Sequence, residues 1–289
     1  MPLVKSDDIN IYYEAYGKGE TIVYLQSPFG GINPGAIFFA GRLSLRHRVI
    51  IWDSPNCGNS GICIKDAPSE WHLSCYYLKA LLDTLGETSV HIAGCSGGGE
   101  MGLLFTHLYG DMVKSLAMYR PTDTTSSVEK EVSRARYRTI AEVAESASME
   151  DVVRFSQNPP STRFSGITKW FFNIYNKDRK AFDDLDGKKI SVLLNKWADY
   201  MENPMFYRAN MNNDELAKIE IPVLVAPCAD EFHTEEIAMD LCRNLPNAKY
   251  IPSPSLRKEN EIYGAILEEH PFGGFAKFVD DYNDFIISL

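Results

Sequence analysis

The 289-residue sequence lacks an excess of positive charge, because 29 lysine and arginine residues stand against 39 aspartate and glutamate residues and form no basic stripe. This shortage disfavours nucleic acid and anionic membrane surfaces as partners. No apolar run is long enough to span a membrane, and the first residues carry no apolar stretch of signal-peptide length after a basic region. We therefore expect a cytoplasmic protein without a membrane partner.

Motifs for metals and nucleotides are missing as well. The six cysteines show no C-x-x-C spacing, and neither a GxxxxGK[ST] loop nor a strand-linked GxGxxG segment occurs. We expect no metal ion, no cofactor and free, mostly buried thiols. The expected partner is a small-molecule substrate, and the sequence leaves open whether the chain forms a homodimer.

The most informative stretch is SVHIAGCSGGGEMGLL, which begins at Ser89. An apolar strand runs into GCSGG at residues 94–98, and a helical pattern follows. This order is typical of a nucleophile elbow, in which a strained strand-to-helix turn exposes the serine hydroxyl. Ser96 is therefore the candidate nucleophile. The backbone N–H of Gly97, at the start of the helix, is a candidate donor to a developing oxyanion.

Apolar runs and helical periods alternate along the chain. Strands are predicted at residues 9–16, 21–26, 48–52, 90–93, 114–118, 221–226 and 249–252. Helices are predicted at residues 69–85, from 97 to about 110, from the N-cap Thr234 to 244, and at 275–287. The strand at 9–16 is expected at a sheet edge. Near-continuous apolar strands separated by helices indicate an α/β fold with a mostly parallel sheet covered on both faces.

The segment from about Arg120 to Ile219 contains helical stretches and no strong strand, with a break at residues 158–161. Between two core strands, a segment of this length predicts a helical cap over the active site. The expected division is a core of residues 1–120 and 220–289 and a cap of residues 121–219. Trp170 and Phe172 are candidate substrate contacts in the cap, although packing inside the cap would also explain its aromatic residues.

Four motifs resemble those of the α/β-hydrolase family: SPFGG from Ser27, DSPNCGNSG from Asp53, the GCSGG elbow, and PVLVAPCAD, which ends at Asp230. The resemblance covers nearly the whole chain. It implies the α/β-hydrolase fold and a catalytic triad in the chain order serine, aspartate, histidine. Within that family, the cysteine before the serine resembles the elbow of members that cleave macrocyclic resorcylic lactones.

The SPFGG segment stands where the family has its HGxxG-like oxyanion loop. The resemblance implies that the backbone N–H of Phe29 is the second oxyanion donor, and the proline before it has no N–H to compete. Gly30 and Gly31 would let a substrate approach this loop closely. Cys95, which precedes the nucleophile, is a further candidate for contact with the substrate.

The resemblance places the triad carboxylate at Asp230, just past the strand that follows the cap. Glu231 is the neighbouring alternative. Asp123, after the preceding strand, is the third choice because some family members carry the carboxylate there.

The triad histidine has two readings. His270 is the only histidine between the last strand and the final helix, so the family's chain order assigns it as the base. On a second alignment, EEHPFGGF matches the segment that follows the family's catalytic histidine by several residues. The position of the base then falls near Tyr263, so the triad would be incomplete. His233 is expected to line the pocket rather than to pair with Asp230, because an aspartate and a histidine three residues apart on one turn rarely form such a pair.

These features predict a serine hydrolase that cleaves a small to medium, largely apolar carboxylic ester or lactone through an acyl-enzyme. An aromatic cap would shelter an uncharged substrate. Two alternatives remain open. A carbon–carbon bond hydrolase of diketone-like substrates would use the same residues, and a ligand-binding protein that has lost catalysis would explain an incomplete triad.

Overall fold

The computed structural model describes residues 2–6, 8–122, 127–157, 167–228, 230, 232–252 and 273–289. Within these ranges, eight strands form one sheet in the order β1-β2-β4-β3-β5-β6-β7-β8. The strands are β1 (Leu3–Ser6), β2 (Ile9–Tyr16), β3 (Thr21–Leu25), β4 (Arg48–Trp52), β5 (Val90–Cys95), β6 (Val113–Tyr119), β7 (Val223–Ala226) and β8 (Ala248–Tyr250). From β4 to β8 neighbouring strands are parallel, whereas β1 and β2 pair antiparallel. The predicted α/β fold with a mostly parallel sheet is confirmed.

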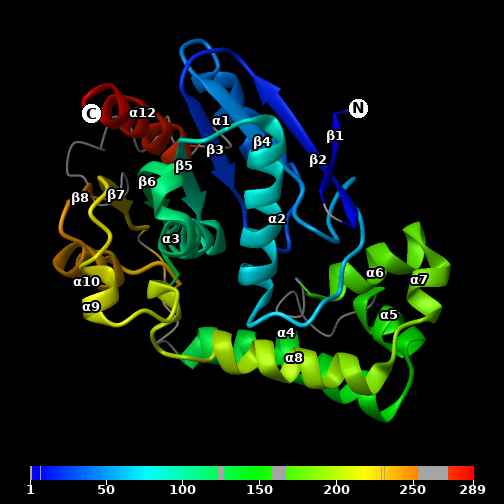
Figure 1. Cartoon of the computed structure of the whole chain (residues 1–289). Coiled ribbons are helices and arrows are strands. Elements are labelled where there is room, and N and C mark those ends of the chain that lie inside the picture. Colours follow the sequence, from blue (N-terminus) through cyan, green and yellow to red (C-terminus); the bar gives the residue numbers. More distant parts are fainter. Residues whose placement is uncertain are drawn as a thin grey trace.

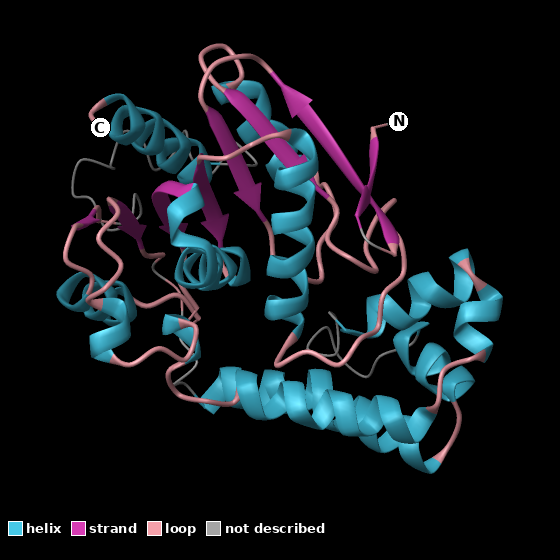
Figure 2. Ribbon diagram, viewed as in Figure 1, coloured by secondary structure: helices cyan, strands magenta, loops and turns pink. Residues whose placement is uncertain are grey.

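The central strands are apolar on both sides because helices cover both faces of the sheet (Figure 1 and Figure 2). In β3, Val23 and Leu25 belong to one core cluster, and Ile22 and Tyr24 belong to the other. The first cluster includes residues of α2 (Glu70–Leu85), α3 (Gly97–Tyr109) and α10 (Glu235–Asn244), and the second includes residues of α1 (Pro34–Leu43) and α12 (Gly273–Ile287).

Six α-helices of the described chain lie between β6 and β7 in the sequence, and the first five are α4 (Ser127–Ser146), α5 (Met149–Gln157), α6 (Ile167–Lys177), α7 (Arg179–Asp183) and α8 (Gly187–Met201). They are followed by the short helices η3 (Phe206–Arg208) and α9 (Asn213–Leu216). The long helices α4 and α8 pack side by side, and the arrowheads of β3 and β5 point towards this pair in Figure 1. The division of the chain into core and cap at residues 120 and 220 stays a prediction.

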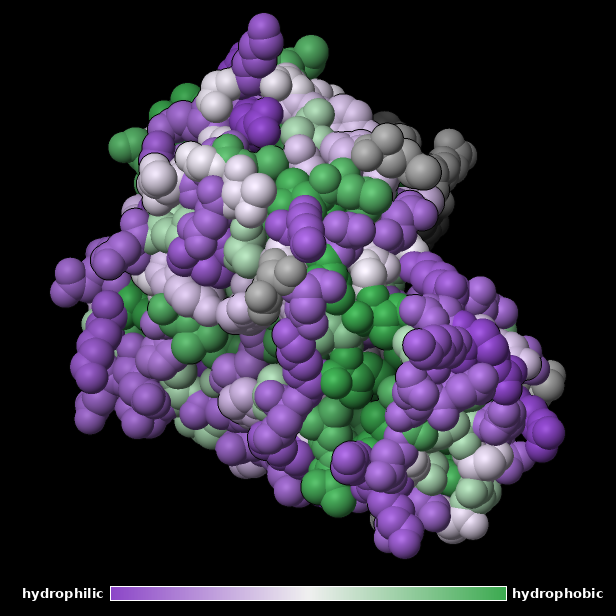
Figure 3. All heavy atoms as spheres, turned by 45° about the vertical axis from the view of Figure 1, so that its right-hand side comes forward, coloured by the Kyte–Doolittle hydropathy of each residue, from purple (hydrophilic) through white to green (hydrophobic). Residues whose placement is uncertain are grey.

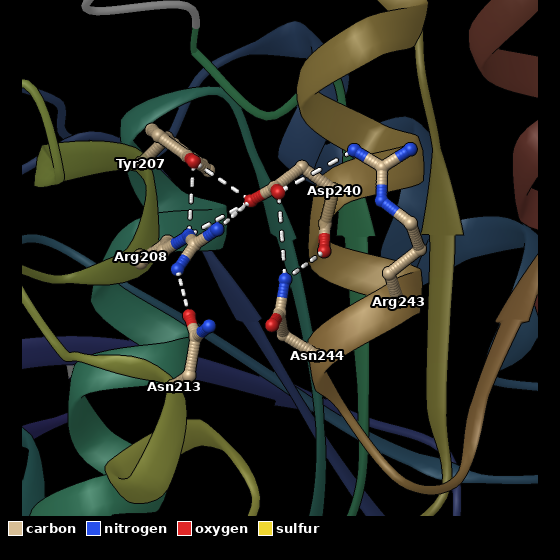
Figure 4. Close-up of polar contacts among 6 residues, drawn as sticks. All are labelled: Tyr207, Arg208, Asn213, Asp240, Arg243 and Asn244. Atoms are coloured by element: carbon tan, nitrogen blue, oxygen red, sulfur yellow. Dashed lines mark hydrogen bonds and ion pairs between the residues drawn. The ribbon is translucent and has the colours of Figure 1, made fainter.

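A buried ion pair joins η3 to α10 (Figure 4). Arg208 is 6% exposed, and its Nε donates to Asp240 Oδ2 at 2.8 Å. Tyr207 donates its hydroxyl to the same oxygen at 2.7 Å, and Arg208 Nη1 donates to Asn213 Oδ1 at 2.6 Å. Because these groups are hydrogen-bonded to one another, the ion pair holds α10 against η3, which follows the inserted helices.

Two elements were not predicted, and one prediction was wrong. The helix α1 and the strand β1 have no counterpart in the expected pattern, and β1 has only two buried residues among its four. Because β1 pairs with Ile9–Tyr16 as the outermost strand, the predicted edge strand is in fact second from the edge. No helix in the described ranges combines the length and hydropathy needed to cross a bilayer.

Candidate active site

The turn between β5 and α3 holds Ser96 in a strained conformation, with φ +52° and ψ −130°. Close packing leaves no room for a side chain two residues before Ser96 or two residues after it. A Cβ on Gly94 would lie 2.1 Å from the carbonyl oxygen of Gly98, and a Cβ on Gly98 would lie 2.1 Å from that of Leu25. The backbone N–H of Ser96 donates to Tyr119 O at 2.8 Å, which ties the turn to β6. The surrounding backbone therefore holds Ser96 in this strained conformation.

The loop after β3 lies against this turn. A Cβ on Gly97 would lie 3.3 Å from Ser27 Oγ, and Trp71 Nε1 donates to the carbonyl of Gly97 at 2.8 Å. The backbone N–H groups of Phe29 and Gly97 make no hydrogen bond to any residue that the structure describes. Their role as donors to an oxyanion beside Ser96 stays a prediction.

Asp53 fixes the position of that loop. Its side chain is buried, and Oδ1 accepts the N–H of Ile32 at 2.5 Å while Oδ2 accepts the N–H of Asn59 at 2.6 Å. A Cβ on Gly31 would lie 2.7 Å from Asp53 Oδ1. The absence of a side chain at Gly31 is therefore explained by packing of the two loops.

His233 lies between Ser96 and Asp230. Its Nε2 is 3.2 Å from Ser96 Oγ, and its Nδ1 is 2.8 Å from Asp230 Oδ1. The expectation that Asp230 and His233 do not pair is wrong. The chain doubles back between them, because the N–H of His233 donates to Asp230 O and the N–H of Cys228 donates to His233 O, so both side chains lie on the same side of the turn.

Arg120 completes this group. Its Nη2 donates to Asp230 Oδ2 at 2.6 Å and lies 3.3 Å from His233 Nδ1. Arg120 follows β6 with φ +58°, and its N–H donates to Ala226 O at 2.7 Å. The positive φ turns the residue out of the strand path, which a sequence pattern does not reveal.

The electrostatics of the group favour an ionised aspartate beside a neutral histidine. Partial burial raises the pKa of Asp230, but His233, the N–H of Phe232 and Arg120 outweigh it and bring the pKa to about 2. Burial and the charge of Arg120 lower the pKa of His233, and the opposing effect of Asp230 is smaller. Such a histidine can accept a proton from a serine hydroxyl near neutral pH.

Thr122 is a further neighbour that sequence reasoning missed. Its Oγ1 lies 3.4 Å from Ser96 Oγ, and its N–H donates to Glu100 Oε1 at 2.6 Å. The residue follows the end of β6, which is parallel to β5, so its place at the same sheet edge as the elbow could have been inferred.

The other predicted site residues differ in their surroundings. Trp170 is buried, donates to Pro28 O at 3.3 Å and has its ring 5.9 Å from that of Phe29. Phe172 is 38% exposed on the same helix. Cys95 is partly buried and packs against the second core cluster, which contains Tyr24.

Some of the predictions fall on residues that the structure does not describe. His270 and Tyr263, the two expected base positions, lie in residues 253–272. Glu231 and Asp123, the alternative carboxylates, also lie outside the described ranges. Their roles stay predictions.

The other described parts of the molecule offer few alternatives to this site. In the described part of the chain, no group of three or more His, Cys, Asp or Glu residues could hold a metal ion. A hollow of about 670 Å³ lies beside α8 and includes Ile64, Leu185 and Ile190 in its lining, but none of the residues around Ser96. Figure 3 shows a band of hydrophobic residues between hydrophilic ones on the side of the molecule that comes forward in that view.

Comparison with known proteins gives a family match and many similar folds. Residues 34–181 match the model of the alpha/beta hydrolase fold family. A hydrolase of Paraburkholderia phymatum named for 2-hydroxy-6-oxononadienedioate and 2-hydroxy-6-oxononatrienedioate is 30% identical over 115 residues, and one of Pseudomonas putida is 31% identical over 119 residues. Each alignment covers 38% of this chain and 40% of the relative, so the chain spans well under half the length of the curated relatives it matches.

Two solved structures illustrate the likeness in fold. The enol-lactonase of Burkholderia xenovorans has a TM-score of 0.59 and 16% identity, with 99% of this chain and 100% of that chain covered. The meta-cleavage product hydrolase of Pseudomonas fluorescens has a TM-score of 0.57 and 12% identity, with 98% of each chain covered. At these identities the likeness concerns the fold.

Proposed function

Because this chain belongs to the alpha/beta hydrolase fold family, we propose that it is a serine hydrolase that cleaves a small to medium, largely apolar carboxylic ester or lactone. One observation carries the proposal. Ser96 stands on a strained elbow, and its Oγ lies 3.2 Å from an imidazole nitrogen that is itself paired with a carboxylate. Nucleophile, base and orienting group in this order activate a serine hydroxyl.

The reaction follows from this placement. Ser96 Oγ attacks the carbonyl carbon while its proton passes to the imidazole, and the N–H groups of Gly97 and Phe29 hold the oxyanion that develops. The imidazolium then protonates the leaving alcohol oxygen. A water molecule, deprotonated by the same imidazole, hydrolyses the acyl-enzyme and restores the serine.

The surroundings of the oxyanion loop support an apolar substrate. The ring of Phe29 lies 5.8 Å from that of Trp71 and 5.9 Å from that of Trp170, and Trp71 packs against Phe206 at 4.8 Å. Trp71, Trp170 and Phe206 are buried and Phe29 is partly buried, so these rings make the surroundings of the loop apolar. The guanidinium of Arg120 forms an ion pair with Asp230 through Nη2.

A second candidate is hydrolysis of a carbon–carbon bond in a diketone-like substrate. The curated relatives favour it, because both are named as hydrolases of a 2-hydroxy-6-oxo dienedioate or trienedioate. Ser96 and its neighbours would serve that reaction too, and the products separate the two candidates. Ester cleavage gives an acid and an alcohol, and lactone cleavage gives a single hydroxy acid. Cleavage of the diketone-like substrate gives an acid and a ketone or enol.

The test is turnover by the wild-type chain and by Ser96→Ala of a panel of p-nitrophenyl esters, apolar lactones and one 2-hydroxy-6-oxo dienoate. We expect hydrolysis of at least one ester or lactone by the wild type and a fall in kcat of about a million-fold for Ser96→Ala. Turnover of the dienoate alone would favour the second candidate. Equal turnover of an ester by Ser96→Ala would contradict both.

A further inference from the structure

We propose that His233 is the catalytic base, so that a single turn between β7 and α10 carries both the carboxylate and the imidazole of the triad. The inference deepens the proposed function and rests on it. It differs from the expectation drawn from chain order, which assigns the base to His270 near the C-terminal helix.

Distances among the described residues support this choice. His233 Nε2 lies 3.2 Å from Ser96 Oγ, within reach for proton transfer. The other histidines of the described chain are His47, His72, His91 and His107. His47 contacts Asn283, His72 contacts Ser69, and His91 contacts Ser115, so these three are engaged elsewhere. His107 is exposed in the last turn of α3, at the far end of that helix from Ser96.

Both oxygens of the Asp230 carboxylate accept hydrogen bonds, and this fixes the imidazole. Oδ1 accepts the N–H of Phe232 at 2.9 Å and faces His233 Nδ1 at 2.8 Å, while Oδ2 accepts from Arg120 at 2.6 Å. An ionised carboxylate can only accept, so it selects the tautomer in which Nδ1 carries the proton. Nε2 is then left as the acceptor that faces Ser96.

Arg120 supports the same tautomer. Its Nη2 is 3.3 Å from His233 Nδ1 and 2.6 Å from Asp230 Oδ2, so its shorter and charge-assisted hydrogen bond goes to the carboxylate. Donation to a bare Nδ1 would select the opposite tautomer. By binding Oδ2, Arg120 holds Oδ1 towards the imidazole.

The turn is anchored at both ends, which explains how so short a segment can position two reacting side chains. On the β7 side, the N–H of Cys228 donates to His233 O at 3.1 Å. On the other side, α10 begins directly after its N-cap Thr234 and is fixed by the ion pair of Asp240 with Arg208 (Figure 4). His233 is 9% exposed, so its ring has little freedom to leave Ser96.

The test measures the rate at which a fluorophosphonate labels Ser96, followed by intact mass, in the wild type, His233→Gln and His270→Gln. His107→Gln is the matched control, because that histidine is exposed on α3. General-base catalysis contributes about 100- to 10,000-fold, so we expect His233→Gln to lose that much while the other two variants keep the wild-type rate.

Chemical rescue separates a lost base from a damaged fold. Added imidazole should restore part of the labelling rate to His233→Gly and none to His270→Gly. Rescue of His270→Gly alone, or a wild-type rate in His233→Gln, would overturn the inference and leave the serine hydrolase standing. A wild-type chain that is not labelled at all would overturn both.

Discussion

Two turns meet at the candidate site, and they are built in different ways. At the elbow, backbone packing fixes Ser96, since the glycines at 94 and 98 leave no space for even one extra carbon. At the turn after β7, side-chain hydrogen bonds fix Asp230 and His233, and Arg120 reaches them from another strand. A turn set by backbone packing leaves a glycine motif in the sequence, whereas a turn set by side-chain partners does not.

After the loss of the nucleophile itself, the largest effect is expected from a change in the second turn. Asp230→Asn replaces an acceptor with a group that can donate to His233 Nδ1, which favours the tautomer unable to take the proton of Ser96. In a Ser-His-Asp triad this change lowers kcat about 10,000-fold, and we expect a similar fall in steady-state ester hydrolysis. A variant that keeps more than about a tenth of the activity would show that Asp230 does not orient the base.

The elbow can be broken by one methyl group. Gly98→Ala places a Cβ 2.1 Å from Leu25 O, so strand and helix must separate. We expect a loss of stability of about 1 to 3 kcal/mol by urea denaturation and a fall in kcat/KM of about 100-fold.

The matched control for that change is Gly99→Ala, because its Cβ would have no neighbour closer than 3.6 Å. An added methyl in a helix normally stabilises, by about 0.5 to 1 kcal/mol. Equal loss of activity in both variants would contradict the role assigned to the close contact at Gly98.

The anchor of the second turn is expected to act on stability more than on chemistry. Asp240→Asn leaves the guanidinium of Arg208, which is 6% exposed, without its charged partner. We expect a loss of about 3 kcal/mol in the free energy of unfolding. Arg243→Gln removes an exposed partner of the same aspartate, 3.4 Å away, and should change stability by less than about 0.5 kcal/mol. Equal losses would show that Arg208 is not held by Asp240.

The smallest expected effect is a shift of the pH profile. His233 acts only when neutral, and burial together with Arg120 lowers its pKa, so kcat/KM should fall only at a pH below the ordinary value for histidine. Arg120→Met removes a cation that lowers this pKa, and the acid limb should move to higher pH. Arg120→Lys keeps the charge and should leave the limb near its wild-type position. An unmoved limb in Arg120→Met would contradict the electrostatic role of Arg120.

The apolar pattern and the glycine motifs of the sequence predict much of the fold and the nucleophile elbow with Ser96. The central strands were predictable because helices cover both of their faces, and the elbow because its packing requires glycine. The strand β1 was not, since only Val4 and Ser6 are buried in it.

The contacts among Asp230, His233 and Arg120 could not be predicted from the sequence. The pairing of Asp230 with His233 depends on the path of a turn, and the contact of Arg120 depends on a positive φ after β6. Neither leaves a periodic pattern. The place of His270 stays a prediction.

Ser96 as the nucleophile and His233 as its base can be tested together by a crystal structure of the wild-type chain after reaction with a fluorophosphonate. We expect phosphorus bonded to Ser96 Oγ, its oxygen about 2.7 to 3.1 Å from the backbone nitrogens of Gly97 and Phe29, and His233 Nε2 beside the adduct. An adduct on another residue, or a different histidine beside the phosphonate, would contradict the claim.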